Sequence, residues 1–142
     1  MRILAILFLP LLMGMTTAMT ELDTAAQGLL FISESDHPLT AFELNASGDP
    51  VPQLQALAGD LAAPVETQAL DYFFRNHTRM EPGAPSDQQE TAQKFRDLQG
   101  LLERTLTGIV VYRVGTVQVH AFIVGRLPDG RYAGLRTLLI ET

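Results

Sequence analysis

Hydrophobic and polar positions along the chain follow two periods, and the change between them marks the main elements. From Ser86 to Leu106 the apolar residues recur every three or four positions. This spacing predicts an amphipathic helix with one face docked on a core. Ser86 and Gln89 have the spacing of a capping box at its start, and Gly108 is expected to close it. The predicted core positions of this helix are Ala92, Phe95, Leu98, Leu101, Leu102 and Leu106.

The last third of the chain has the composition and alternation of β-strands. Residues 109–114, 117–124 and 131–140 are rich in β-branched and aromatic side chains, and a Pro-Asp-Gly turn precedes the last of them. The link at Gly115-Thr116 is short enough for a tight hairpin. These three segments are therefore predicted to form an antiparallel meander.

The first half of the chain predicts shorter elements. A helix is expected from Thr20, with Asp23 at capping-box spacing and Gly28 at its end. The apolar run 29–32 is predicted to be a buried strand or a core-anchored loop. Pro38 favours extended geometry for the acidic segment that lies between this run and the proline. Further along, a strand at 39–44, a helical turn at 52–58 ended by Gly59, and a short strand with an aromatic helical turn within 65–74 are expected. Strands and helices in blocks indicate the α+β class.

The N-terminus has a composition of its own. Arg2, an apolar run over residues 3–15 and a small-residue end at Ala18 are the parts of a secretory signal peptide. The run is too short for a membrane-spanning helix, which needs about 20 residues. We therefore expect residues 1–18 to be a leader and residues 19–142 to form one domain that is exported, periplasmic or secreted. The alternative is an over-extended start and a cytoplasmic protein, with translation beginning at Met13, Met15 or Met19.

Composition removes several classes of function. The chain has 142 residues with 10 Lys+Arg, 16 Asp+Glu and no cysteine, for a net charge of -6. Cysteine chemistry and disulfides are excluded, and the acidic balance argues against direct binding of nucleic acid. Without Arg2 the net charge becomes -7.

No familiar catalytic motif is present, and the three histidines, His37, His77 and His120, stand far apart. A metal-assisted hydrolase could use Glu34, Asp36 and His37, but neighbouring residues of an extended segment point to opposite sides. A solvated or partner-facing acidic loop is the alternative. His120 reads as a packed or edge residue. The aromatic residues of the helical turn are predicted to be core residues: Tyr72, Phe73 and Phe74. The arginines of the meander are predicted to be solvated edge charges: Arg113, Arg126, Arg131 and Arg136.

The chain ends in a predicted strand, with no polar tail after it. A strand that continues to the terminus fixes where the last residue lies. Thr142 then offers a hydroxyl and a carboxylate at one defined place, which is the oxygen set that a hard cation prefers. The alternative is a strand that simply ends there.

Several of these segments together resemble one known family. They are Gly28 to Pro38 (GLLFISESDHP), Asp71 to Phe74, Lys94-Phe95, Val111 to Gly115, Val124-Gly125, Gly130, Ala133-Gly134 and the final Glu141-Thr142. Their order and spacing resemble the nuclease A inhibitor family, whose members block sugar-non-specific nucleases. The resemblance extends from about Ala25 to Thr142, and Ser33-Glu34-Ser35 and Glu141-Thr142 are its most specific parts.

The resemblance implies a single α-β-α layered domain without catalytic residues, cofactor or metal of its own. It implies a monomer that forms a 1:1 complex with a Mg²⁺-dependent, non-specific endonuclease. In such inhibitors the glutamate of the Ser-Glu-Ser segment pairs with active-site arginines, and the terminal threonine reaches the catalytic magnesium. These residues correspond to Glu34 and Thr142, and the resemblance makes Ser33, Ser35 and Glu141 further partner-binding candidates. The acidic charge agrees, because a nuclease active site that holds phosphates is cationic.

One family feature is absent. Family members place an acidic-aromatic contact in the loop before the long helix, whereas the corresponding Glu81 to Pro85 contains no aromatic residue. The sequence therefore leaves open whether the loop Arg79–Asp87 contacts the target. An exported binding module for another partner stands as an alternative to the inhibitor.

Overall fold

A five-stranded antiparallel sheet is the centre of the molecule. The computed structural model describes residues 17–45 and 48–142, and within them the strand order is β3-β7-β6-β5-β4. The predicted meander is confirmed as its central part, with β3 and β4 added at the two edges. The strands are β3 (Thr40–Leu44), β4 (Val65–Gln68), β5 (Thr107–Val114), β6 (Gln118–Arg126) and β7 (Tyr132–Ile140).

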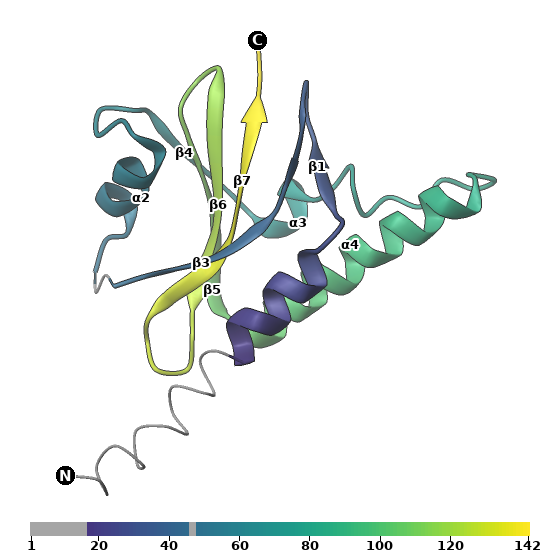
Figure 1. The fold of residues 1–142 in the computed structure, drawn as a ribbon, viewed down its shortest axis with the longest axis horizontal. Coiled ribbons are helices and arrows are strands. Elements are labelled where there is room, and N and C mark those ends of the chain that lie inside the picture. Colours follow the sequence, from purple (N-terminus) through teal and green to yellow (C-terminus); the bar gives the residue numbers. More distant parts are fainter. Residues whose placement is uncertain (1–16, 46–47) are drawn as a thin grey trace, which may run out of the picture.

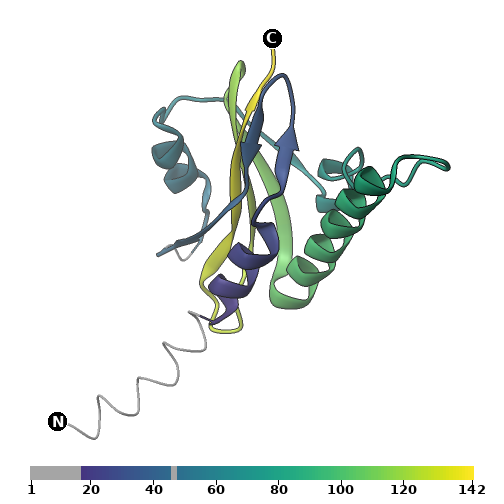
Figure 2. The same ribbon diagram turned by 45° about the vertical axis from the view of Figure 1, so that its right-hand side comes forward.

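Helices cover both faces of this sheet, which gives the expected α-β-α layers of an α+β domain. Figure 2 shows the sheet between α2 (Val51–Ala58) on one side and α4 (Ser86–Thr105) on the other. The helix at residues 17–26 and α3 (Leu70–Phe73) lie on the side of α4. The larger core forms here, from Leu22, Phe74, Phe95 and Leu102 against sheet residues such as Val111 and Leu135. Leu54 of α2 packs with Phe122 and Val124 in a smaller core on the opposite face.

A separate two-stranded hairpin lies beside the sheet. β1 (Leu30–Ile32) and β2 (Asp36–Pro38) pair antiparallel, with Phe31 opposite His37. Phe31 is buried in the larger core, while Leu30 and Ile32 are exposed on the outside. The segment 29–32 is thus a strand anchored by alternate residues, and the extended acidic segment after it forms the turn and β2. This anchoring places the turn at residues 33–35 next to the end of β7 (Figure 1).

The long helix agrees with its predicted period but not with its predicted ends. Its buried residues are Ala92, Phe95, Leu98 and Leu102, and Leu106 follows it into the core. The capping box is wrong, because Pro85 occupies the N-cap position and no side chain caps the helix. Helical geometry ends at Thr105 instead of Gly108, which lies in β5 at an irregular register with β6 and has a φ of +62°. Leu106 is buried in extended geometry, so β5 begins at Thr107, before the glycine that was expected to end the helix.

The shorter elements also depart in places from the expectations. Thr20 does not begin a helix, because residues 17–19 are already helical. Gly59 ends α2 as predicted, with a left-handed φ of +84°. Phe73 and Phe74 are core residues as expected, but Tyr72 is 51% exposed, because a short helix cannot bury three consecutive side chains on one face.

The predicted leader lies largely outside the described residues, which begin at residue 17. Ala18 and Met19 are half-buried and pack against the larger core. Within the described part of the chain, no helix has the length and apolar character needed to cross a membrane.

Candidate functional site

Three chain segments meet at one end of the sheet. They are the β1–β2 turn at residues 33–35, the β5–β6 turn at residues 115–117, and the C-terminus, all of which lie near the end marked C in Figure 1. The N–H of Glu34 donates to the carbonyl of Ile140 (3.2 Å), and the N–H of Glu141 donates to the carbonyl of Val117 (2.9 Å). The last strand is therefore held on both sides up to its final residues.

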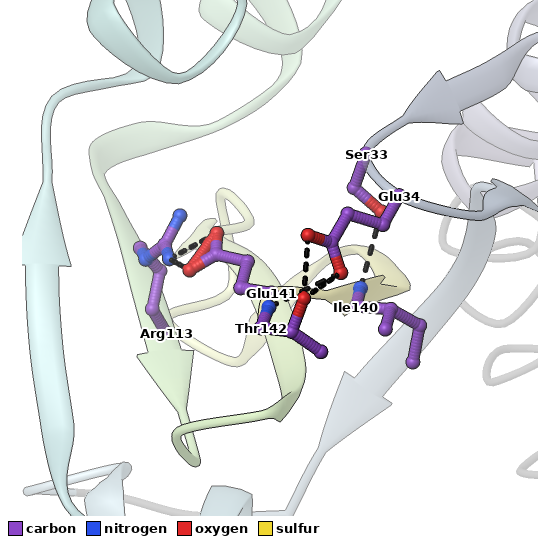
Figure 3. A network of polar contacts seen from close by, with 6 residues as sticks. All are labelled: Ser33, Glu34, Arg113, Ile140, Glu141 and Thr142. Carbon is purple, nitrogen blue, oxygen red and sulfur yellow. Dashed lines mark hydrogen bonds and ion pairs between the residues drawn. The ribbon is translucent and has the colours of Figure 1, made fainter.

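Ser33 connects the β1–β2 turn to β7 through its side chain. Its hydroxyl donates to the carbonyl of Ser35 (2.8 Å) and accepts from the N–H of Ile140 (3.1 Å), as Figure 3 shows for the second contact. One hydroxyl thereby satisfies backbone groups on two segments more than 100 residues apart. Ser33 is placed at the predicted site, and its contacts there fix the turn.

The two residues that carried the sequence prediction are in direct contact. The hydroxyl of Thr142 lies 2.7 Å from both carboxylate oxygens of Glu34, and the N–H of Thr142 donates to one of them at 3.1 Å (Figure 3). Both residues are exposed. A carboxylate with two oxygens has about four acceptor positions, so Glu34 keeps capacity for a further donor. The hydroxyl of Thr142 donates its hydrogen to Glu34 and keeps its oxygen lone pairs.

Glu141 is paired within the chain. Its carboxylate receives two hydrogen bonds from one terminal nitrogen of Arg113, one of them at 2.6 Å (Figure 3). The Arg113 side chain is only 16% exposed, compared with 43% for that of Glu141. The prediction that Arg113 is a solvated edge charge is wrong, because its guanidinium forms an ion pair with Glu141. Sequence patterns could not show that these two residues lie side by side.

The remaining acidic-loop residues do not gather around a metal position. Ser35 bonds through its hydroxyl to Nε2 of His37 (2.7 Å), while the Glu34 carboxylate faces Thr142. Among the described residues no group of three His, Cys, Asp or Glu side chains could hold a metal ion. The geometry of Glu34, Asp36 and His37 therefore gives the hydrolase hypothesis no support.

A pocket of about 340 Å³, which no sequence pattern indicated, lies beside the Glu34–Thr142 contact. His77 and Gln68 line it, and each has a buried side-chain atom, Nδ1 and Oε1, without a hydrogen-bond partner among the described residues. Nε2 of His77 accepts from the N–H of Ile32 (2.9 Å), and its ring stacks on Phe31. Burial lowers the pKa of His77 below its ordinary value of 6.5, which favours the neutral ring that can accept this bond. The signal in the sequence was the aromatic turn preceding His77.

The loop before α4 borders a second hollow, next to the first. Arg79, Glu81 and Asp87 line a groove of about 700 Å³ together with the exposed Leu30 and Ile32 of β1. Arg79 and Glu81 form an exposed ion pair at 3.7 Å. The loop and the Glu34 turn thus lie on adjoining parts of the surface.

The other residues considered from the sequence have structural contacts. His120 is half-buried on β6, and burial followed by the nearby charge of Arg136 lowers its pKa. Arg126 donates to the carbonyl of Gly130, Arg131 donates to Asn45, and Arg136 lies over the ring of Phe122. His120 is half-buried, in line with the packed or edge residue that was expected, and each of these three arginines contacts another residue of the fold.

The fold and the site define a small layered domain that exposes an acidic turn and an ordered chain end. Comparison with protein families gives a match to the nuclease A inhibitor-like protein model over residues 16–142. Because the match covers nearly the whole chain, the chain belongs to this family, whose members are inhibitors of nucleases. A search of curated proteins found no match.

Proposed function

We propose that this protein is a stoichiometric inhibitor of a Mg²⁺-dependent, sugar-non-specific endonuclease. Glu34 pairs with active-site arginines of the enzyme, and Thr142 reaches its magnesium ion. The protein works as a monomer in a 1:1 complex and performs no chemistry itself. The observation that carries the proposal is the contact between Glu34 and Thr142 at an exposed end of the sheet.

Charge at this end supports the proposal. Glu34 and Glu141 bring two negative charges, and Arg113 offsets one of them. A nuclease active site is built to hold phosphates with cationic groups, so it attracts such an acidic surface. The acidic balance of the whole chain adds to the rate of encounter.

The shape of the site supports it as well. Flexible groups lose conformational freedom when they bind, and contacts made beforehand reduce that cost. Backbone bonds to Ile140 and Val117 and the side chain of Ser33 already hold the turn and the chain end together. Ser35, beside Glu34 in the same turn, completes the proposed partner-binding surface, whereas the carboxylate of Glu141 is paired with Arg113 within the chain.

The test is a titration of purified non-specific endonucleases, beginning with any encoded in the same genome, at constant Mg²⁺. We expect activity to fall linearly to zero near one equivalent. A chain extended by several residues after Thr142 should inhibit much less well, whereas the same extension at the N-terminus should have no effect. Full nuclease activity at a several-fold excess of the protein, across such enzymes, would contradict the proposal and favour a binding module with another partner.

Export is a separate part of the proposal. Residues 1–18 act as a leader, and the inhibitor acts in the periplasm or outside the cell. N-terminal sequencing of the mature protein from each cell fraction tests this part. A cytoplasmic protein that begins at Met13, Met15 or Met19 would replace export and leave the inhibition unaffected.

A further inference from the structure

The last two residues lie beyond β7, which ends at Ile140. Chain ends usually lose order unless something ties them down. Here the N–H of Glu141 is bonded to Val117 and its carboxylate to Arg113, while Thr142 is bonded to Glu34. The side-chain contact with Arg113 is the one that reaches back into the less exposed part of the sheet.

Arg113 reaches Glu141 over two small or medium side chains. In the sheet register Arg113 lies opposite Ala121, and Val119 lies opposite Leu139, the second residue before Glu141. Side chains two residues apart on a strand share a face, so Arg113 and Glu141 lie on the same face two strands apart. Ala121 leaves room for the long arginine side chain to extend across β6.

The pairing selects a distant partner over a nearer one. Glu66 on β4 lies directly opposite Arg113 in the register and is exposed. Within the described residues the arginine makes its ion pair with Glu141, two strands away, and not with Glu66 on the adjacent strand. The Arg113 side chain is 16% exposed and that of Glu141 is 43% exposed, so this ion pair is less screened by water than a fully exposed pair.

This pair also opposes a repulsion. The carboxylates of Glu34 and Glu141 belong to the same site, because Thr142, the residue after Glu141, is bonded to Glu34, and like charges disfavour each other. Without a cation, the chain end would lower its electrostatic energy by moving away from Glu34. Arg113 supplies that cation from the side opposite to Glu34 (Figure 3).

We propose that the Arg113–Glu141 ion pair is a positioning element that holds Thr142 against Glu34, and that Glu141 acts through Arg113 instead of contacting the nuclease. The inference rests on the proposed function for its effect on inhibition. The part of the inference that concerns the order of Glu141 and Thr142 in the free protein does not depend on the proposed function.

The experiment compares four variants of the full chain: Arg113→Gln, Glu141→Gln, the two combined, and the exchange of Arg113→Glu with Glu141→Arg. We expect each single variant to weaken inhibition about tenfold, because binding must then order the chain end. The combined variant should be no weaker than either single one, and the exchange should recover most of the loss. Glu66→Gln is the matched control and should inhibit like the unaltered protein.

The exchange is the decisive variant. If Glu141 touches the cationic nuclease directly, an arginine at that position is repelled and inhibition falls further. That result, or Glu141→Gln weakening inhibition while Arg113→Gln does not, would overturn the inference. Additive losses in the combined variant would overturn it too.

A second measurement needs no nuclease. Amide hydrogen exchange of Thr142 in the free protein should accelerate in Arg113→Gln and Glu141→Gln and return toward its original rate in the exchanged pair. Unchanged protection of the Thr142 amide in folded Arg113→Gln would refute the positioning role. If the unaltered protein inhibits no nuclease, the proposed function fails while this measurement still decides the positioning.

Discussion

Thr142 and Glu34 are 108 positions apart in the sequence, yet the hydroxyl of one lies 2.7 Å from the carboxylate of the other. The contact joins the turn of the β1–β2 hairpin to the end of the central sheet. It brings an acidic side chain and the chain's terminal residue to one exposed place.

Replacing Glu34 with glutamine should remove a charge that the nuclease site attracts while preserving the shape. Loss of one partner of a desolvated charge pair costs about 2–5 kcal/mol, which corresponds to roughly 30- to 5,000-fold weaker inhibition. The inhibition constant at fixed Mg²⁺ measures this loss, and the melting temperature should change little because Glu34 is exposed. Glu103→Gln, which changes another exposed carboxylate, on α4, is the control. Equal losses in both variants would mean that only overall charge matters.

Ser33→Ala should destabilise the fold by about 1–3 kcal/mol, because the N–H of Ile140 loses its acceptor. Urea unfolding followed by circular dichroism measures the difference. The matched control is Ser86→Ala at the start of α4, where no side chain caps the helix, and it should lie within about 0.5 kcal/mol of the unaltered protein. A large loss in Ser86→Ala would restore the capping box that the sequence suggested.

Phe74→Ala should cost about 3–5 kcal/mol, since this fully buried ring contacts the rings of Phe73 and Phe95 in the larger core. Tyr72→Ala, two residues away, should cost less than about 1 kcal/mol, because the ring is 51% exposed and lies against Arg75 in a cation–π contact. The same unfolding measurement compares the two. Similar costs would contradict the burial of Phe74.

Stability should fall with acid through His77. Burial lowers its pKa in the folded protein below 6.5, so the unfolded chain takes up the proton first as pH decreases. The contribution of neutral His77 to the free energy of unfolding is therefore complete above about pH 6.5. It is lost as the pH falls from there to the lower pKa that His77 has in the folded protein. Unfolding free energies of the unaltered protein and His77→Gln, measured from about pH 8 to about pH 5, should converge toward acid.

The pKa of His120 is also lowered in the folded protein, so His120→Gln is needed as the comparison. Each variant should remove part of the slope of stability against pH, and the two combined should remove more than either. Parallel curves for His77→Gln and the unaltered protein would show that the ring titrates normally in the fold.

Much of the fold could be predicted because it depends on local patterns. The helical period of α4, the alternation of β5 to β7 and the left-handed glycine that ends α2 all reflect interactions between residues close in sequence. The errors occurred where packing overrode a local signal. Burial of Leu106 ended α4 before Gly108, and Pro85 took the cap position ahead of Ser86.

By itself the sequence determined the class of fold, the acidic charge and, through its resemblance, Glu34 and Thr142 as candidate residues. Their contact, the commitment of Glu141 to Arg113 and the use of Ser33 to fasten the turn to Ile140 were decided only by the tertiary structure. The physical reason is that hydrogen bonds and ion pairs between distant segments depend on strand register and on which residues share a face. Those relations exist only after the sheet has formed.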